Sequence, residues 1–191
     1  MHEWITRLTG QLEPILQLRD PRPKISSYHD MPYAIFRYSP QVEFALRTEL
    51  RMLRTRLEQA GKRVTEVSLA VCLEQALAAE LPMADLIEAE RAAGIEAAID
   101  TVHEVLSSYQ PLHTLVVDAI PPHADPLTDL VFITRAGALF PAYRCSSLLE
   151  QLKGHVHVPS VLFYPGELDG PAGLKFMGVL DPEHNYRPKI F

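Results

Sequence analysis

The sequence is poor in the residues that several common kinds of functional site require. Its two cysteines, Cys72 and Cys145, match no metal-binding or redox spacing, and we expect both to be buried thiols in a reducing compartment. No apolar run approaches the roughly 18 residues that a membrane span needs. The start of the chain also lacks the uninterrupted apolar stretch of a signal peptide. These features predict a cytoplasmic protein with no membrane segment.

Glycine is missing from the positions at which nucleotide-binding folds need it. The segment after the first expected strand reads RYSPQVEF and has no glycine, and the segment TRAGALFPAYRC has only Gly137. A phosphate cradle needs a glycine-rich turn after a strand. HExxH and GxSxG motifs are absent too, and two ligands such as His155 and His157 do not make a metal site. We therefore expect no cofactor, no metal ion and no catalytic residue.

Charge is unevenly spread along the 191 residues, whose formal net charge is −6. Residues 1–63 carry 11 Lys/Arg against 7 Asp/Glu, whereas residues 64–130 carry only Arg91 against 12 acidic residues. A protein that coats nucleic acid is usually basic overall. Here any nucleic-acid role would have to use a local basic patch, and the acidic middle suits a basic protein partner better.

Hydrophobic patterning predicts one α/β domain with a short, mostly parallel sheet flanked by helices. Short apolar runs separated by helical patterns are typical of such a sheet. We expect strands at 33–38, 63–69, 129–137, 158–164 and 173–180, and main helices at 41–60 and 146–153. The same single domain, 1–191, contains an N-terminal helix with a proline-rich connector (1–30), a helical insertion (68–120) for which Ser68 is a plausible N-cap, and an ordered C-terminal tail (180–191).

Arginines recur on the helix predicted over residues 41–60. Arg47, Arg51 and Arg54 fall at i, i+4 and i+7, opposite much of a leucine stripe. Such a face is usually solvated and stabilised by pairs such as Glu43–Arg47. Two alternatives stay open, namely a surface for a protein partner and a weak DNA contact through the basic 47–63 helix.

Aromatic and basic side chains also gather in the segments after two strands and in the last residues. Loops that follow parallel strands meet at one edge of the sheet, where sites form, and Arg and Tyr often anchor interfaces. The same residues could simply close the core. We expect the tail to be ordered near Arg135 and Tyr164, with Phe191 packed on the sheet edge. The candidate partner-binding residues are Arg47, Arg51, Arg54, Arg135, Tyr143, Arg144, Tyr164, Asn185, Tyr186 and Arg187.

Four segments resemble the BrxB family: AIFRY…EFALRTELRMLRTRLE, VFITRAGALFPAYRCSSLLEQL, VPSVLFYPGELDG and GLKFMGVLDPEHNYRPKIF. The last segment is the most specific of the four. The resemblance implies the small component of a BREX bacteriophage-exclusion system, which marks host DNA by methylation and blocks phage replication. It implies a non-catalytic protein that works with other BREX proteins and contacts PglZ directly. An accessory DNA-binding subunit, a degenerate nucleotide-binding enzyme and a homodimer are the alternatives.

Overall fold

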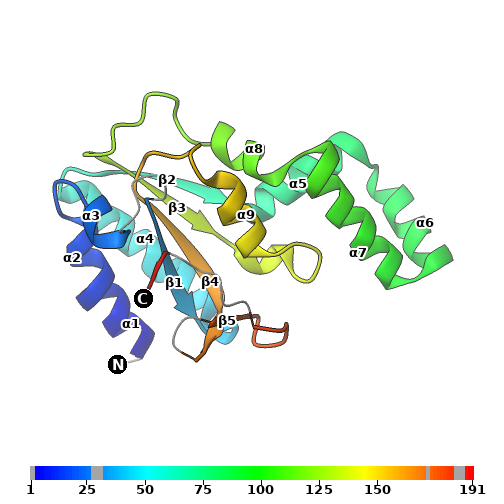
Figure 1. Cartoon of the computed structure of the whole chain (residues 1–191), viewed down its shortest axis with the longest axis horizontal. Coiled ribbons are helices and arrows are strands. Elements are labelled where there is room, and N and C mark those ends of the chain that lie inside the picture. The colour runs from blue at the N-terminus through cyan, green and yellow to red at the C-terminus, as the bar shows by residue number, and fades with distance from the viewer. Residues whose placement is uncertain (1–2, 27–31, 171–172, 183–187) are drawn as a thin grey trace.

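A six-stranded β-sheet forms the centre of the computed structural model, which describes residues 3–26, 32–170, 173–182 and 188–191 (Figure 1). The strands follow the order β2-β3-β4-β1-β6 with every neighbour parallel, and β5 pairs with β4 in the antiparallel direction. The predicted α/β class with a mostly parallel sheet is therefore confirmed. The strands are β1 (Tyr33–Tyr38), β2 (Arg63–Ser68), β3 (Asp129–Thr134), β4 (Ser160–Asp169), β5 (Gly173–Phe176) and β6 (Lys189–Ile190).

One face of the sheet is covered by the first helices of the chain. Strand β3 is buried along its whole length, as expected for a parallel strand with helices on both sides. The predicted leucine stripe of α4 faces this core through Leu46, Leu50, Leu53 and Leu57. The helical elements that precede β2 are α1 (Glu3–Arg7), a π-helical turn (Leu8–Leu12), α2 (Glu13–Leu16), α3 (Arg22–Ile25), a 3-10 turn (Pro40–Val42) and α4 (Glu43–Gln59).

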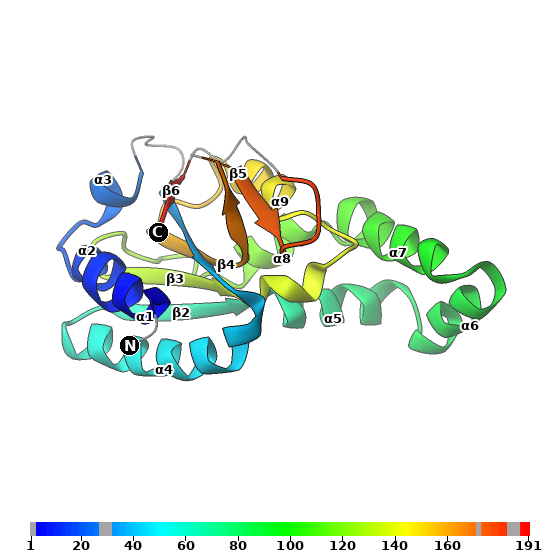
Figure 2. The ribbon, with the colours of Figure 1, turned by 90° about the horizontal axis from the view of Figure 1, so that it is seen from below.

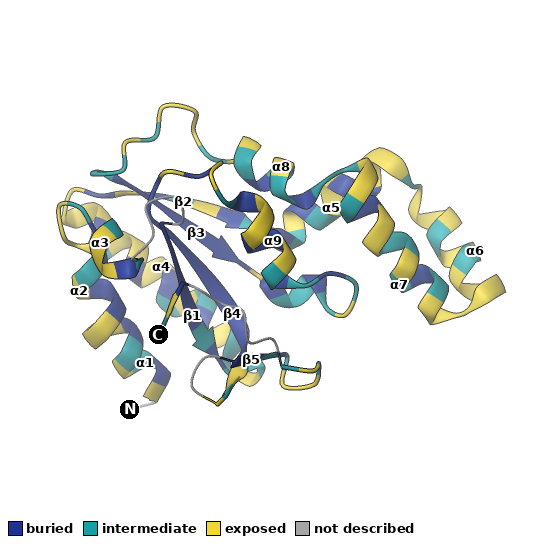
Figure 3. Cartoon of the chain, viewed as in Figure 1, coloured by how far each residue is buried: buried dark blue, intermediate teal, exposed yellow. Residues whose placement is uncertain are grey.

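The opposite face is covered by helices from the middle of the chain, and Figure 3 shows the buried sheet between the two layers. The hydroxyl of Tyr33 donates a hydrogen bond to the carbonyl of Leu152, which ties β1 to the end of α9. These helical elements are α5 (Leu69–Glu80), a π-helical turn (Val105–Tyr109), α8 (Leu112–Asp118), a 3-10 turn (Ala136–Leu139) and α9 (Cys145–Leu152).

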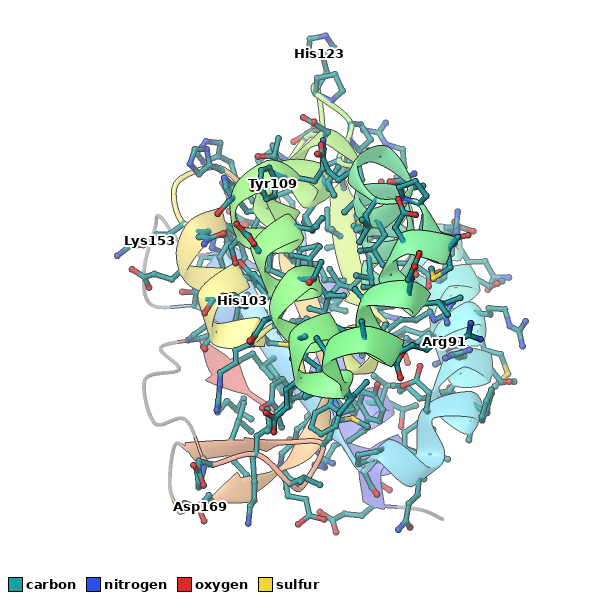
Figure 4. All side chains as sticks on the ribbon, turned by 90° about the vertical axis from the view of Figure 1, so that its right-hand side faces the viewer. Arg91, His103, Tyr109, His123, Lys153 and Asp169 are labelled. Atoms are coloured by element: carbon teal, nitrogen blue, oxygen red, sulfur yellow. The ribbon has the colours of Figure 1, made fainter. Side chains whose placement is uncertain are left out.

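Two helices between α5 and α8 project from the body as an arm (Figure 2). They are α6 (Met83–Ala93), which has no buried residue, and α7 (Ile95–Glu104), which buries only Ala98. Gly94 makes the turn between them with a φ of 88°, a conformation that glycine adopts without steric cost. Figure 4 looks onto this arm, with Arg91 extending from it. Six of the 12 acidic residues of the segment 64–130 lie in this projecting arm.

The last residues add a short strand to the sheet. Strand β6 pairs in parallel with β1, and Phe191 continues the ladder by donating its N–H to the carbonyl of Ile35 at 2.8 Å. The N–H of Arg37 donates in turn to the carbonyl of Phe191 at 3.1 Å. The Phe191 side chain is only 5% exposed and belongs to the core under α4. The described end of the chain is thus ordered on the β1 edge, one strand away from Tyr164 in β4.

Two local features differ from the sequence interpretation. Ser68 occupies the predicted N-cap position of α5, but its side chain makes no capping hydrogen bond, and its buried hydroxyl has no hydrogen-bond partner among the described residues. Lys62, which looks like part of a basic surface patch, is instead buried. Its ammonium group donates to the carbonyls of Leu18, Arg19 and Leu127 at 2.6, 3.2 and 2.7 Å. A lysine that bridges three carbonyls is a structural tie and contributes nothing to a surface for nucleic acid.

Candidate functional site

A cavity of about 230 Å³ lies at the carboxyl-terminal edge of the parallel strands. This is the edge at which ligands bind in open α/β sheets, because the loops after the strands meet there. Residues from the segments that follow β1, β3 and β5, and from β4 itself, contribute to its wall, so the fold brings distant parts of the chain together. The lining residues are Pro40, Glu43, Arg47, Arg135, Gly137, Ala138, Pro165 and Met177.

The backbone around this cavity is unusual. Arg135 and Met177 have φ values of 58° and 54°, and within the described ranges they are the non-glycine residues with positive φ. Both line the cavity. A left-handed conformation costs a residue with a β-carbon roughly 1–2 kcal/mol, and such strain clusters at functional sites. In Arg135 it turns the chain sharply between β3 and the 3-10 turn whose buried Ala136 and Leu139 hold the loop in place.

A short chain of polar contacts fixes the Arg47 side chain at the wall of the cavity. Glu43 accepts hydrogen bonds from the buried hydroxyl of Tyr38 and from Nε of Arg47, the latter at 2.8 Å. Burial, followed by the hydrogen bond to Glu43, raises the pKa of Tyr38, so this phenol stays protonated near neutral pH. The arrangement presents an oriented cation and a carboxylate beside apolar side chains.

The exposed surface of α4 adjoins the cavity, and we define it as Phe44, Arg47, Arg51, Met52 and Arg54. Phe44 is 78% exposed although it is a large aromatic residue. The guanidinium carbon of Arg47 lies 5.0 Å from the centre of the Phe44 ring, which is a cation–π arrangement. An exposed aromatic stacked with arginine has the chemistry of an interface anchor. The signal for Phe44 was present in the sequence, because this apolar residue lies outside the leucine stripe of its helix.

Ion pairs neutralise much of the positive charge on α4. Arg47 pairs with Glu43 and Arg54 with Glu58, both at 2.8 Å, as the i, i+4 spacing predicted. Arg51 donates instead to the hydroxyl of Thr48 at 3.2 Å. The neutralised pairs leave less charge for a phosphate backbone than the count of arginines indicates. A weak DNA contact through residues 47–63 stays a prediction.

The predicted partner-binding residues fall into four groups. Arg47 and Arg135 meet in the cavity, and Arg51 and Arg54 lie next to it on α4. Tyr143 and Tyr164 lie in the core, where the Tyr143 hydroxyl donates to Gln151 at 3.1 Å, so neither side chain is available at the surface. Arg144 is half-buried and donates to the carbonyl of Asp181 at 3.3 Å. Asn185, Tyr186 and Arg187 fall outside the described residues.

The described ranges contain no cluster of three or more His, Cys, Asp or Glu side chains that could hold a metal ion. In the same ranges, no helix combines the length and the apolar character needed to cross a membrane. Cys72 and Cys145 are both buried thiols that form no disulfide with each other, and burial raises the pKa of Cys72. The side chains at and beside the cavity on the carboxyl edge are mainly arginine, aromatic and apolar.

The fold and this edge define a class of protein: a single-domain, doubly covered α/β protein with an arginine-lined cavity and a projecting helical arm. The sequence model of the family described as BREX protein BrxB matches residues 65–190. A curated relative named BREX protein BrxB, from Bacillus cereus (strain H3081.97), is 27% identical over 161 residues, which cover 83% of this chain and 82% of that protein. No solved structure gives a significant match.

The chain belongs to the BrxB family, and it is thereby a component of BREX phage-defence systems. The matched residues run from β2 through β6 and include Arg135, whereas β1 and α4 precede them. The resemblance seen in the sequence segments is confirmed.

Proposed function

We propose that this chain is a non-catalytic protein-interaction component of a BREX complex and that it contacts PglZ through the exposed surface of α4 and the adjoining cavity. The observation that carries the proposal is the pair formed by Phe44 and Arg47. The Phe44 residue is 78% exposed and its ring lies against Arg47. Arg47 lines the same cavity as Arg135, whose backbone is strained. Large exposed aromatics and arginines are the residues that dominate interface energies.

The size and chemistry of the cavity support a binding role over turnover. Small-molecule sites usually enclose about 300–1,000 Å³, and this cavity of about 230 Å³ is smaller. The carboxylate of Glu43 at its wall is already engaged, because it accepts hydrogen bonds from Tyr38 and Arg47. Among the residues that the structure describes, no serine, cysteine or histidine lines it. A partner side chain that enters the cavity would meet an oriented arginine and the apolar surfaces of Pro40, Pro165 and Met177.

The test is the affinity of the purified chain for purified PglZ, measured by biolayer interferometry at several salt concentrations. Phe44→Ala should weaken binding about 30-fold or more, because anchor residues contribute about 2 kcal/mol or more. Its control is Ile87→Ala, since Ile87 is an exposed apolar residue on the projecting arm. Arg51→Glu should lower the association rate most strongly at low salt. Its control is Arg91→Glu, which reverses a charge on the arm.

The outcomes separate the partner from the surface. An absence of association at micromolar concentration would contradict PglZ as the partner. Association that Phe44→Ala and Arg51→Glu leave unchanged would contradict the α4 surface. A salt-dependent shift of a short DNA duplex, lost in Arg51→Glu, would favour the accessory DNA-binding role instead.

A further inference from the structure

A second, larger cavity lies on the other side of the same sheet edge. It has a volume of about 410 Å³ and is bounded by the first turns of α1 and by the chain near the carboxyl ends of β1 and β4. Trp4 and Arg7 contribute from α1, and Arg37 contributes from β1. Glu3 and Glu167 also line it. The first cavity shares no lining residue with it.

Two residues that line this cavity, Trp4 and Arg7, carry buried hydrogen-bond donors that have no acceptor among the described residues. Nε1 of Trp4 and both Nε and Nη1 of Arg7 are buried and make no hydrogen bond. Trp4 itself is 8% exposed. Buried polar groups in folded proteins are nearly always paired, and each exception calls for an explanation. The remaining Arg7 nitrogen, Nη2, donates to the backbone carbonyl of Arg37 at 3.1 Å, which leaves the rest of the guanidinium unsatisfied.

The carboxylate of Glu3 does not accept a hydrogen bond from the buried Nε–H of Arg7. Oε1 of Glu3 lies 3.8 Å from Nε of Arg7, beyond hydrogen-bond distance, and the Glu3 side chain is 83% exposed. The guanidinium of Arg7 lies over the ring of Phe36, 5.3 Å from its centre. This stacking occupies the flat face of the guanidinium. The N–H groups point along the edge of that plane and are not satisfied by it.

The guanidinium of Arg37 adds a second positive charge to this cavity. Arg37 is half-buried, and its side chain makes no hydrogen bond or ion pair with any residue that the structure describes. Burial and the neighbouring charge of Arg37 both lower the pKa of Arg7, although an arginine remains protonated at neutral pH. Two neighbouring cations with few hydrogen bonds are unfavourable together, and the 3.8 Å ion pair of Arg7 with the exposed Glu3 offsets this only in part.

We propose that this cavity is a binding site for a carboxylate group, held by Arg37, Arg7 and Trp4. A guanidinium presents parallel N–H groups whose spacing matches the two oxygens of a carboxylate. The indole N–H of Trp4 supplies a further donor. Glu3 and Glu167 at the wall repel a doubly charged phosphate more strongly than a singly charged carboxylate, which favours the latter. This inference does not depend on PglZ and concerns a different surface from α4.

The chain carries its own reporter for this site, because Trp4 is its single tryptophan. The experiment follows the Trp4 emission during titration with sodium acetate, with a hexaglutamate peptide and with potassium phosphate. Sodium chloride keeps the ionic strength constant. We expect a saturable change in emission with acetate or with the peptide. A tighter response to the peptide identifies an acidic protein segment as the source, and an equal or tighter response to acetate identifies a small free carboxylate.

Arg37→Gln is the decisive variant, because the Arg37 side chain makes no hydrogen bond or ion pair within the described ranges, so its replacement leaves the contacts of the fold in place. It should weaken carboxylate binding about ten-fold or more, since a hydrogen-bonded charge is lost. Arg91→Gln removes an arginine from the projecting arm and should leave binding unchanged. The proposal is overturned if neither carboxylate gives a saturable response, if Arg37→Gln binds as tightly as the unaltered chain, or if phosphate binds more tightly than both carboxylates.

Discussion

The contribution of Phe191 to stability is the prediction that the structure defines most closely. Its side chain is 5% exposed and packs in the core between the sheet and α4. Burial of a phenylalanine side chain contributes about 1.5–3 kcal/mol, and internal Phe→Ala changes cost about 3–5 kcal/mol because a cavity remains. A residue beside a two-residue strand can move to reduce that cavity. We therefore expect Phe191→Ala to lower the free energy of unfolding by about 2–3 kcal/mol.

The assay is urea unfolding followed by the emission of Trp4, which lies in the same core cluster as Phe191. In a thermal melt the same change corresponds to a decrease of about 4–12 °C in Tm. Amide exchange gives a local test, because the N–H of Arg37 donates to the Phe191 carbonyl and should exchange faster in the variant. Val179→Ala, at a residue that is 70% exposed, is the matched control. A Phe191→Ala protein as stable as this control would refute the assignment of the tail to the core.

Three further changes test other parts of the fold by denaturant titration. Gly166→Ala should lower the free energy of unfolding by about 1–3 kcal/mol, because the new Cβ would lie 2.4 Å from the Lys175 carbonyl oxygen. The control is Gly10→Ala, whose Cβ would meet nothing within 4 Å and which should be neutral or stabilising. Equal losses of stability in the two variants would contradict this expectation. Arg135→Gly should raise the free energy of unfolding by about 0.5–1 kcal/mol, because glycine adopts the left-handed backbone conformation without strain. The same change should weaken PglZ binding. A loss of stability would show that the backbone of Arg135, with its φ of 58°, is not strained. Arg63→Gln removes hydrogen bonds that lower the pKa of Asp129. A lowered carboxyl pKa stabilises the fold at pH values above the unfolded pKa, and this stabilisation is lost as the pH falls through the folded pKa. The variant should therefore be less stable at pH 7 and equal to the parent once the pH is below the folded pKa of Asp129. A difference that persists after Asp129 is protonated would exclude this origin.

The sheet and most helices could be predicted because their patterns are local. The apolar runs of β1, β3 and β4 and the leucine stripe of α4 are visible within single windows of sequence. Strand β6 was missed because two residues carry no alternation, and its existence depends on the free edge of β1. The left-handed backbone of Arg135 was equally invisible, since glycine is the usual marker of that conformation.

The site residues were harder to predict because a side-chain type does not reveal its direction. Tyr143 and Tyr164 have the composition of interface residues, but helix α9 and strand β5 cover them. Arg47 and Arg135 lie far apart in sequence, and only the meeting of helix α4 with the segment after β3 at one sheet edge brings them to the same cavity. Arg7 and Arg37 were not singled out at all. Their significance lies in missing hydrogen bonds, which no sequence pattern records.

Strand β6 also determines how other proteins can approach this sheet. A bare β1 would expose a row of N–H and C=O groups, to which an extended peptide could add as a further strand. Lys189, Ile190 and Phe191 already occupy these positions, and the Phe191 ring anchors them in the core. A partner that added a strand to β1 would first have to displace β6 from that edge. Recognition through side chains, on α4 or in the two cavities, carries no such penalty.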